Sequence, residues 1–273
     1  MNGWTGDRMS ERVQKILSQW GIASRRKAEQ MILEGRVHIN GQCAQLGQKV
    51  DLSHDQIWVD GQRLHREHQP QLIYLLLHKP IGVVCTCDDP AHRATVLDLL
   101  PPELRQGQGL HPVGRLDVDS TGALLLTNDG DLTFALTHPR HHIPKVYRVW
   151  VQGYPSAAAI AQWRQGLWLD GQKTLPAQVQ IRRKHLQGKT LLEVVLREGR
   201  NRQIRRVADA LGYPVLQLER TAIGPIQLHP KQGPDLAYGC YRMLTETEVG
   251  LLRTQIDLLS KQEHLAVGEE CNV

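Results

Sequence analysis

One acidic residue, at the junction of a glycine-containing turn and an apolar run, constrains this chain more than any other feature. Residues 114–117 read Gly-Arg-Leu-Asp, and residues 123–126 read Ala-Leu-Leu-Leu. An apolar run of this length is typical of a buried strand. Loops held by such a scaffold often carry catalytic groups. We therefore expect the carboxylate of Asp117 to be a reactive group.

Two other interpretations of the same segment are open on these residues alone. Asp117, Asp119 and Gly122 match the start of a calcium-binding loop, which has oxygen ligands at alternate positions and a glycine at the sixth. That loop also needs a bidentate Glu at its twelfth position, and Asn128 stands there. The segment could instead be a structural turn, because Asp and Gly are favoured in turns for local backbone reasons.

Two strand-like segments carry further polar side chains. Residues 77–83 read Leu-His-Lys-Pro-Ile-Gly-Val and follow an apolar run that starts at Leu72. Residues 145–151 read Lys-Val-Tyr-Arg-Val-Trp-Val, which places Tyr147 and Val149 on one face of a strand. A half-buried strand tyrosine with no catalytic role would explain Tyr147 as well.

Residues 198–206 are rich in arginine and precede a helical pattern. Asn201 is suited to cap a helix whose apolar residues recur at helical spacing from Ile204. Arg205 then projects from the first turn of that helix. A solvated basic helix face is the alternative explanation for the other arginines, Arg200, Arg202 and Arg206.

In this order along the chain, the four segments resemble the motifs of a family of RNA pseudouridine synthases. Residues 114–127 resemble its pattern G-R-L-D-x-x-(S/T)-x-G-L-L-L-(L/F)-T, with Ala123 where leucine is usual. The other patterns are K-P-x-G at residues 79–82, K-x-Y-x-V at 145–149 and E-G-(R/K)-x-x-Q-(I/V)-(R/K)-R at 198–206. The family includes bacterial enzymes of the RsuA/RluB type, which act on ribosomal RNA and carry an N-terminal S4 domain.

The resemblance implies that uridine is isomerised to pseudouridine, a reaction in which the base leaves N1 and rejoins the sugar through C5. It implies Asp117 as the catalytic carboxylate, Tyr147 against the target uracil, and Arg205 paired with Asp117. A nearby guanidinium favours the ionised form of an acid. No cofactor and no metal are implied, because nothing is added or removed overall. Basic residues near the motifs are expected to bind RNA: Arg115, Arg200, Arg202 and Arg206.

The N-terminal part resembles a second module, the S4 RNA-binding domain, through residues 23–29 and 35–41. Ser10 and Ser24 are suited to cap two short helices that precede the second of these segments. In that module the second helix and the following loop contact RNA phosphates through cationic side chains. The expected RNA-binding residues are Arg25, Arg26, Lys27 and Arg36. A merely soluble surface is the alternative, because Glu29 lies on the same helix.

We predict an α+β protein in three parts, with a largely antiparallel or mixed sheet in the second. Residues 9–68 form the S4-like domain, 69–261 the catalytic domain and 262–273 a mobile C-terminal tail. Thr245 and Glu248 have the form of a capping box and open a helix with Leu252 and Ile256 directed inward.

Composition limits the partners and the location. The chain has 273 residues and a net charge of +5, which favours a polyanionic partner. Its five cysteines include no C-x-x-C pair, which disfavours a disulfide framework or a zinc site. The sequence has no signal peptide pattern and no run long enough to cross a bilayer, so we expect a cytoplasmic protein without a membrane partner. The resemblance implies ribosomal RNA or a ribosomal assembly intermediate as partner, favours the large subunit over the small, and implies no obligate protein partner.

Two other functions are weighed against this one. A non-catalytic RNA-binding or ribosome-assembly factor on the same fold would be expected to lack the Asp, Tyr or Arg of the motifs. A glycosidase or metal-dependent nuclease would need a second carboxylate or a metal, for which Asp119, Asp129 and Asp131 are the available acids.

Overall fold

The computed structural model describes residues 10–230 and 235–270, and the side chains of Arg66 and of residues 259–270 are outside that description. The chain divides into two compact units. The first comprises the N-terminal residues to Ile73 together with 100–111 and 127–130. The second takes the remaining residues from Tyr74 onward. The predicted boundary at residue 68 assigned the two inserted segments to the catalytic domain, whereas the structure packs them with the N-terminal residues.

The first unit joins two short helices to a small sheet. Its helices are α1 (Val13–Gln19), α2 (Arg25–Leu33) and α3 (Pro102–Arg105), with a 3-10 turn η1 (Arg66–His68). An antiparallel sheet has the order β3 (Gln42–Cys43), β2 (Val37–Ile39), β5 (Ile57–Val59), β6 (Gln62–Arg63), and β1 (Glu11–Arg12) pairs with β4 (Lys49–Val50). The apolar faces of α1 and α2 enclose one core with Val37 and Ile57.

One of the two predicted helix caps is present in this unit. The hydroxyl of Ser24 accepts a hydrogen bond from the amide of Lys27 at the start of α2. The prediction for Ser10 is wrong, because residues 11–12 form a strand and α1 begins at Val13 after Arg12, without a side-chain cap. The amide of Val13 instead donates to the carbonyl of Gln48.

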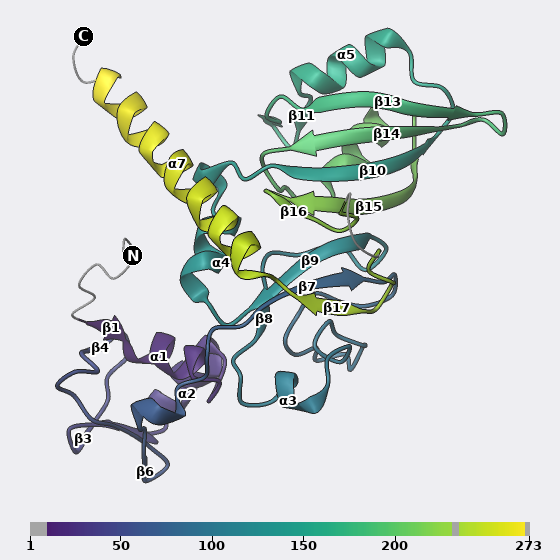
Figure 1. Ribbon diagram of the computed structural model, residues 1–273. Helices are drawn as coiled ribbons and strands as arrows, with labels where there is room; N and C mark the ends of the chain where they lie inside the picture. Colours follow the sequence, from purple (N-terminus) through teal and green to yellow (C-terminus); the bar gives the residue numbers. More distant parts are fainter. Residues whose placement is uncertain (1–9, 231–234, 271–273) are drawn as a thin grey trace. The chain divides into compact units, whose positions relative to one another are not determined.

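The second unit is built on a nine-stranded mixed sheet, several strands of which lie side by side in Figure 1. Its main path runs β13 (Gln178–His185), β14 (Lys189–Leu196), β10 (Lys145–Gln152), β15 (Val215–Ile223), β9 (Thr121–Thr127), β7 (Tyr74–Lys79), β17 (Tyr241–Met243). The remaining strands are β8 (His111–Pro112) and β16 (Ile226–Gln227) in this sheet, and the separate hairpin β11 (Trp168–Leu169) with β12 (Gln172–Lys173). β15 and β9 are parallel, whereas β10 is antiparallel to both of its neighbours. The α+β class predicted from the sequence is confirmed.

Helices cover this sheet with apolar faces. They are α4 (Gly130–Thr137), the 3-10 turn η2 (Pro139–His141), α5 (Ala157–Gln165), α6 (Gln203–Ala210) and α7 (Glu246–Glu270). One apolar cluster joins α5 and α6 to β10, β13 and β14, and another joins α4 and α7 to β7 and β9. The strand alternation predicted for residues 145–151 is confirmed, because Tyr147, Val149 and Val151 are buried in the first cluster.

The C-terminal segment is helical further than the sequence suggested. The capping box at the start of α7 is present, with the amide of Glu248 donating to the hydroxyl of Thr245 and the amide of Thr245 donating to the carboxylate of Glu248. The backbone of α7 continues to Glu270, through most of the segment from residue 262 that was predicted as a mobile tail. Residues 271–273 of that predicted tail lie outside the described part of the chain.

Candidate active site

Asp117 lies in the loop between β8 and β9, and three hydrogen bonds to backbone carbonyls hold this loop in place. The amide of Ser120 donates to the carbonyl of Asp117 at 3.1 Å, closing a turn. The amide of Gly82 donates to the carbonyl of Val118 at 2.8 Å. The fully buried Lys79 donates from Nζ to the carbonyl of Ser120 at 2.9 Å. The segment around Lys79 and Gly82 therefore holds the loop that presents Asp117.

Cys85 and Gly122 also contribute to the position of the loop that carries Asp117. The amide of Leu116, next to Asp117, donates to the sulfur of Cys85 at 3.3 Å, and burial raises the pKa of that thiol. Gly122 has a φ of +112°, and a Cβ placed on it would lie 2.2 Å from the carbonyl oxygen of Arg220. A glycine is needed here, because no larger residue permits this approach of β9 to β15.

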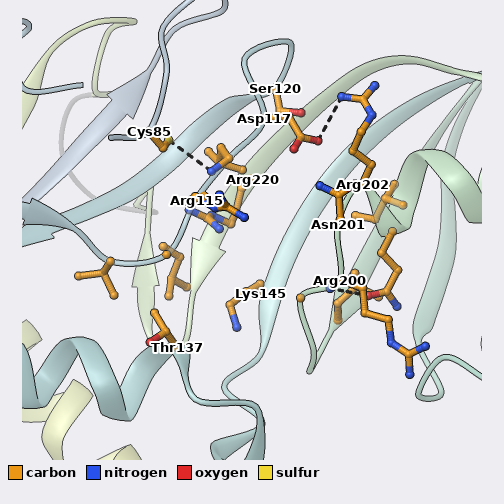
Figure 2. Close-up of a pocket in the computed structure, with 18 of the residues that line it drawn as sticks. Cys85, Arg115, Asp117, Ser120, Thr137, Lys145, Arg200, Asn201, Arg202 and Arg220 are labelled. Atoms are coloured by element: carbon orange, nitrogen blue, oxygen red, sulfur yellow. Dashed lines mark hydrogen bonds and ion pairs between the residues drawn. The ribbon is translucent and has the colours of Figure 1, made fainter. Parts of the chain in front are cut away.

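Two arginines at the start of α6, Arg202 and Arg205, contact the loop that carries Asp117 and Asp119, which we call the acidic loop. Nη1 of Arg202 lies 3.5 Å from Oδ2 of Asp117, and its two Nη atoms donate to the carboxylate of Asp119 at 3.1 and 3.0 Å. Figure 2 shows Arg202 directed toward Asp117. Arg205 donates from Nη2 to the carbonyl of Asp119 at 2.8 Å and to the hydroxyl of Ser120 at 3.3 Å.

The expected ion pair between Arg205 and Asp117 is therefore corrected. Among the described residues, the ion pair of Asp117 is with Arg202, while Nε of Arg205 lies 3.4 Å from Oδ2 of Asp119. The physical reason is the position of each arginine. Arg202 precedes α6 in a left-handed conformation with φ of 48° and lies over the carboxylates, whereas Arg205 is held against the backbone of residues 119 and 120.

The predicted cap at Asn201 is also wrong. The residue before α6 is Arg202, and no side chain caps this end of the helix. Gln203 organises the turn instead, since its amide nitrogen donates to Glu198 at 2.7 Å and its amide oxygen accepts from the backbone of Arg200 at 3.3 Å. The conformation of Arg202 thus depends on polar contacts of its neighbours.

Asp117 and Asp119 differ in how closely the arginines bind their carboxylates. Hydrogen bonds from Arg202, with the nearby charge of Arg205, hold the pKa of Asp119 below its usual range. Asp119 is therefore an ionised anchor for both arginines. The side chain of Asp117 is 31% exposed and contacts Arg202 at the longer distance of 3.5 Å. This leaves Asp117 as the less engaged carboxylate of the two.

A cavity of about 640 Å³ lies beside these groups and is large enough for a nucleotide base and its sugar. Asp117, Tyr147, Arg202, Lys145 and Arg220 are among the residues that line it. Tyr147 is 8% exposed and lies opposite Arg220 in the pairing of β10 with β15. The structure therefore brings Asp117 and Tyr147, which are distant in sequence, to one pocket.

The remaining arginines of the predicted set differ in their availability. Arg115 is exposed and lines the cavity. Arg200 is bound to Glu198 at 3.0 Å and to backbone carbonyls of β12. Arg206 forms a two-pronged contact with Asp170, at 2.8 and 2.6 Å. Arg200 and Arg206 thus stabilise the fold around the β11–β12 hairpin, and Arg115 keeps its charge available at the cavity.

The predicted RNA-binding residues of the S4-like unit also divide into exposed cations and cations held in internal ion pairs. Arg25, Arg26 and Lys27 are exposed in the first turn of α2. Arg36 is held by both oxygens of Asp60 at 2.7 Å each and by Glu34 at 3.2 Å. The first turn of α2 is therefore the better candidate for phosphate contacts.

Two pocket residues were not identified from the sequence as functional. Lys145 belongs to one of the motifs but was not predicted as a site residue. Burial and the charge of Arg220 lower its pKa to about 8. Arg220 lies in a strand pattern outside the four motifs, and no feature of the sequence indicates a role for it. The resemblance did contain the signal for Lys145, because the lysine is part of the K-x-Y pattern.

The described residues contain no cluster suited to a metal ion and no helix suited to span a membrane. In residues 10–230 and 235–270, no group of three or more His, Cys, Asp and Glu side chains is arranged to hold a metal ion. Within the same ranges, every helix is too short or too polar to cross a bilayer.

A loop held through its backbone presents Asp117 to the same cavity as the buried Tyr147, and a separate unit is S4-like. This combination is expected of an RNA-modifying enzyme. Comparison with known families agrees: the model for RNA pseudouridylate synthase matches residues 73–210, and the model for the S4 domain matches residues 11–57. The chain belongs to the RNA pseudouridylate synthase family and is an isomerase.

Individual relatives cover nearly the whole chain. An uncharacterized RNA pseudouridine synthase of Mycobacterium tuberculosis is 41% identical over 90% of this chain and 94% of its own length. Ribosomal large subunit pseudouridine synthase B of Bacillus subtilis is 39% identical over 90% of this chain and 97% of its own length. A crystal structure of a pseudouridylate synthase covers 88% of this chain and 99% of that chain, with 32% identity and a TM-score of 0.62.

Proposed function

We propose that the protein converts a specific uridine of large-subunit ribosomal RNA to pseudouridine, with Asp117 as the catalytic carboxylate. The observation that carries the site assignment is the shared cavity of Asp117 and Tyr147. The similarity to ribosomal large subunit pseudouridine synthase B of Bacillus subtilis supports the substrate. Ribosomal RNA or an assembly intermediate would be the partner, and such a substrate would place the enzyme in the cytoplasm.

Each group has a definite part in this proposal. The target nucleotide is flipped out of the RNA into the cavity, because its reacting atoms are otherwise stacked in the fold. Asp117 acts on the flipped nucleotide, and Arg202 lies beside its carboxylate, with Nη1 3.5 Å from Oδ2. Tyr147 lies against the uracil and keeps water away from it. Arg205 is a positioning residue, since it fixes the backbone at residues 119 and 120.

Release of tritium from ribosomal RNA labelled at uridine C5 tests the proposal. The wild-type protein should release tritium without added metal or cofactor, and Asp117→Asn should slow release by about 10³-fold or more, as expected for loss of an essential catalytic group. Asp170→Asn is the matched control, because it removes a carboxylate that binds an arginine of α6 on the surface. It should keep the wild-type rate.

Mapping of the product decides the substrate. Pseudouridine at one position of the large-subunit RNA supports the proposal, whereas modification of small-subunit RNA alone would contradict it. Binding of ribosomal particles with no tritium release by wild type or variant would instead favour an RNA-binding assembly factor.

A further inference from the structure

Two cations of the catalytic cavity, Arg220 and Lys145, form no ion pair with a carboxylate among the described residues, whereas Arg200, Arg202 and Arg205 each do. Arg220 is 3% exposed, and its Nε donates to the carbonyl of Ala123 at 2.7 Å. Its Nη2 is buried and has no hydrogen-bond partner within the described residues. Lys145 donates from Nζ to the carbonyl of Ile143 at 3.1 Å. Figure 2 shows both side chains in the pocket that contains Asp117.

This arrangement is costly for a residue that only stabilises the fold. A buried guanidinium without a carboxylate or a full set of acceptors is strongly unfavourable for folding. The neighbouring arginines differ in having a carboxylate beside them, since Arg202 contacts Asp119 and Arg200 contacts Glu198. The buried Nε of Arg205 also has no hydrogen-bond partner among the described residues, but it lies 3.4 Å from Oδ2 of Asp119. An ammonium has three donors, and the contact with Ile143 uses one of those of Lys145. Donors of both cations therefore remain for a group that enters the cavity.

We propose that Arg220 and Lys145 form a catalytic site for the carbonyl oxygens of the target uracil and stabilise the negative charge that develops on them. The proposal rests on the uridine isomerisation proposed above and adds two catalytic residues to it. Donors that are fixed in place before the reaction, in a pocket with little water, stabilise developing charge more than solvent does.

The proposed reaction passes through a negatively charged uracil, which is the group that the two cations would stabilise. When the N1–C1′ bond breaks, its electron pair stays with the uracil and is spread over N1, O2 and O4. The base then turns, C5 bonds to C1′ with a pair from the ring, the hydrogen on C5 leaves as a proton, and N1 takes up a proton. The anionic base between these two bonding steps is the species that a guanidinium and an ammonium stabilise.

The position of Arg220 favours the base over a phosphate as the bound group. Arg220 lies opposite Tyr147 in the strand pairing, and Tyr147 is the residue expected against the uracil. A phosphate of the RNA backbone stays near the protein surface, where the exposed Arg115 lines the cavity. The uracil is the part of the flipped nucleotide that reaches a residue only 3% exposed.

Sulfur substitution in the substrate tests the contact directly. We would prepare target RNA fragments with uridine, 2-thiouridine or 4-thiouridine at the modified position and measure single-turnover rates at saturating enzyme. Sulfur accepts hydrogen bonds weakly, so one thio substrate should be slower with wild-type protein. Arg220→Gln and Lys145→Met should each slow the natural substrate by about 10²-fold, as does removal of one preorganised donor. They should also abolish most of the additional thio effect.

Further variants separate a lost contact from a damaged fold. Arg220→Lys keeps a buried cation and should regain part of the rate. Arg183→Gln and Lys184→Met on the exposed surface of β13 are matched controls and should keep both the rate and the thio effect. RNA affinity and thermal melting are measured for every variant.

Two results would overturn the proposal while wild-type protein still forms pseudouridine. One is a wild-type rate in both Arg220→Gln and Lys145→Met. The other is a slow rate in folded variants whose thio effects equal that of the wild type, which would indicate a purely structural role. Absence of product with wild-type protein would be a failure of the proposed function itself.

Discussion

At the scale of single residues, the lowered pKa of Lys145 predicts a pH dependence of the reaction rate. Its pKa is lowered from the ordinary value to about 8, first by burial and then by the charge of Arg220. A lysine is protonated below its pKa, so Lys145 carries its charge at neutral pH and loses it as the pH rises through about 8. If this charge assists catalysis, kcat/KM should fall above that pH, because kcat/KM reports the free enzyme.

The variant Lys145→Arg identifies the titrating group. An arginine keeps its charge throughout this range, so its kcat/KM should stay level where that of the wild type declines. Lys184→Arg, on the exposed surface of β13, should retain the wild-type decline. A decline that persists unchanged in Lys145→Arg would assign the titration to a group other than Lys145.

At the scale of elements, the pairing of β9 with β15 depends on Gly122. Gly122→Ala would place a methyl group 2.2 Å from the carbonyl oxygen of Arg220, at a φ of +112° that L-residues rarely adopt. We expect a loss of about 2–4 kcal/mol in the free energy of unfolding, from overpacking and backbone strain together. Urea unfolding measures it.

Gly188→Ala is the control for strain alone. Its φ is +70°, and a Cβ there would meet nothing within 4 Å. Its cost should be about 1 kcal/mol, the value for one residue in the left-handed region. Equal losses in the two variants would show that the close approach to Arg220 contributes nothing.

The elements themselves were predicted well where the pattern is periodic and poorly where side-chain contacts decide. Alternation over residues 145–151 predicted β10 and its buried face correctly, because a strand with one buried face must alternate. The caps at Ser24 and Thr245 were correct, whereas those at Ser10 and Asn201 were wrong. At Ser10 a strand pairing takes the place of the cap, and at Asn201 the contacts of Gln203 set the start of the helix. Such contacts join distant or irregular segments that sequence spacing does not reveal.

At the scale of the whole molecule, the candidate site was likewise predicted in part from sequence motifs, and the rest depends on tertiary contacts. The motifs predicted Asp117 and Tyr147 as site residues, and both line one cavity in the structure. They also implied the family, and the comparisons confirm that family. They did not identify which arginine faces Asp117, because that depends on the backbone conformation at Arg202. Nor did they identify Arg220, since a single arginine in a strand becomes a pocket residue only when β9, β10 and β15 are assembled.

RNA binding by the S4-like unit depends on which of its charges are free to contact phosphates. Arg26 is exposed in the first turn of α2, whereas the guanidinium of Arg36 already binds Asp60 through two hydrogen bonds of 2.7 Å. A cation that neutralises a phosphate releases counterions, so its removal reduces the dependence of affinity on salt. Arg26→Gln should therefore weaken binding of ribosomal RNA and reduce the slope of log affinity against log salt by about 1.

Arg36→Gln serves as the comparison within the same unit. It removes the same charge but breaks an internal ion pair, so it should leave the salt slope close to that of the wild type. Filter binding at several salt concentrations, with thermal melting as a check of folding, measures both variants. A larger fall in slope for Arg36→Gln than for Arg26→Gln would mean that Arg36 leaves Asp60 to bind phosphate, and RNA recognition would then involve rearrangement of this pair rather than the exposed turn of α2.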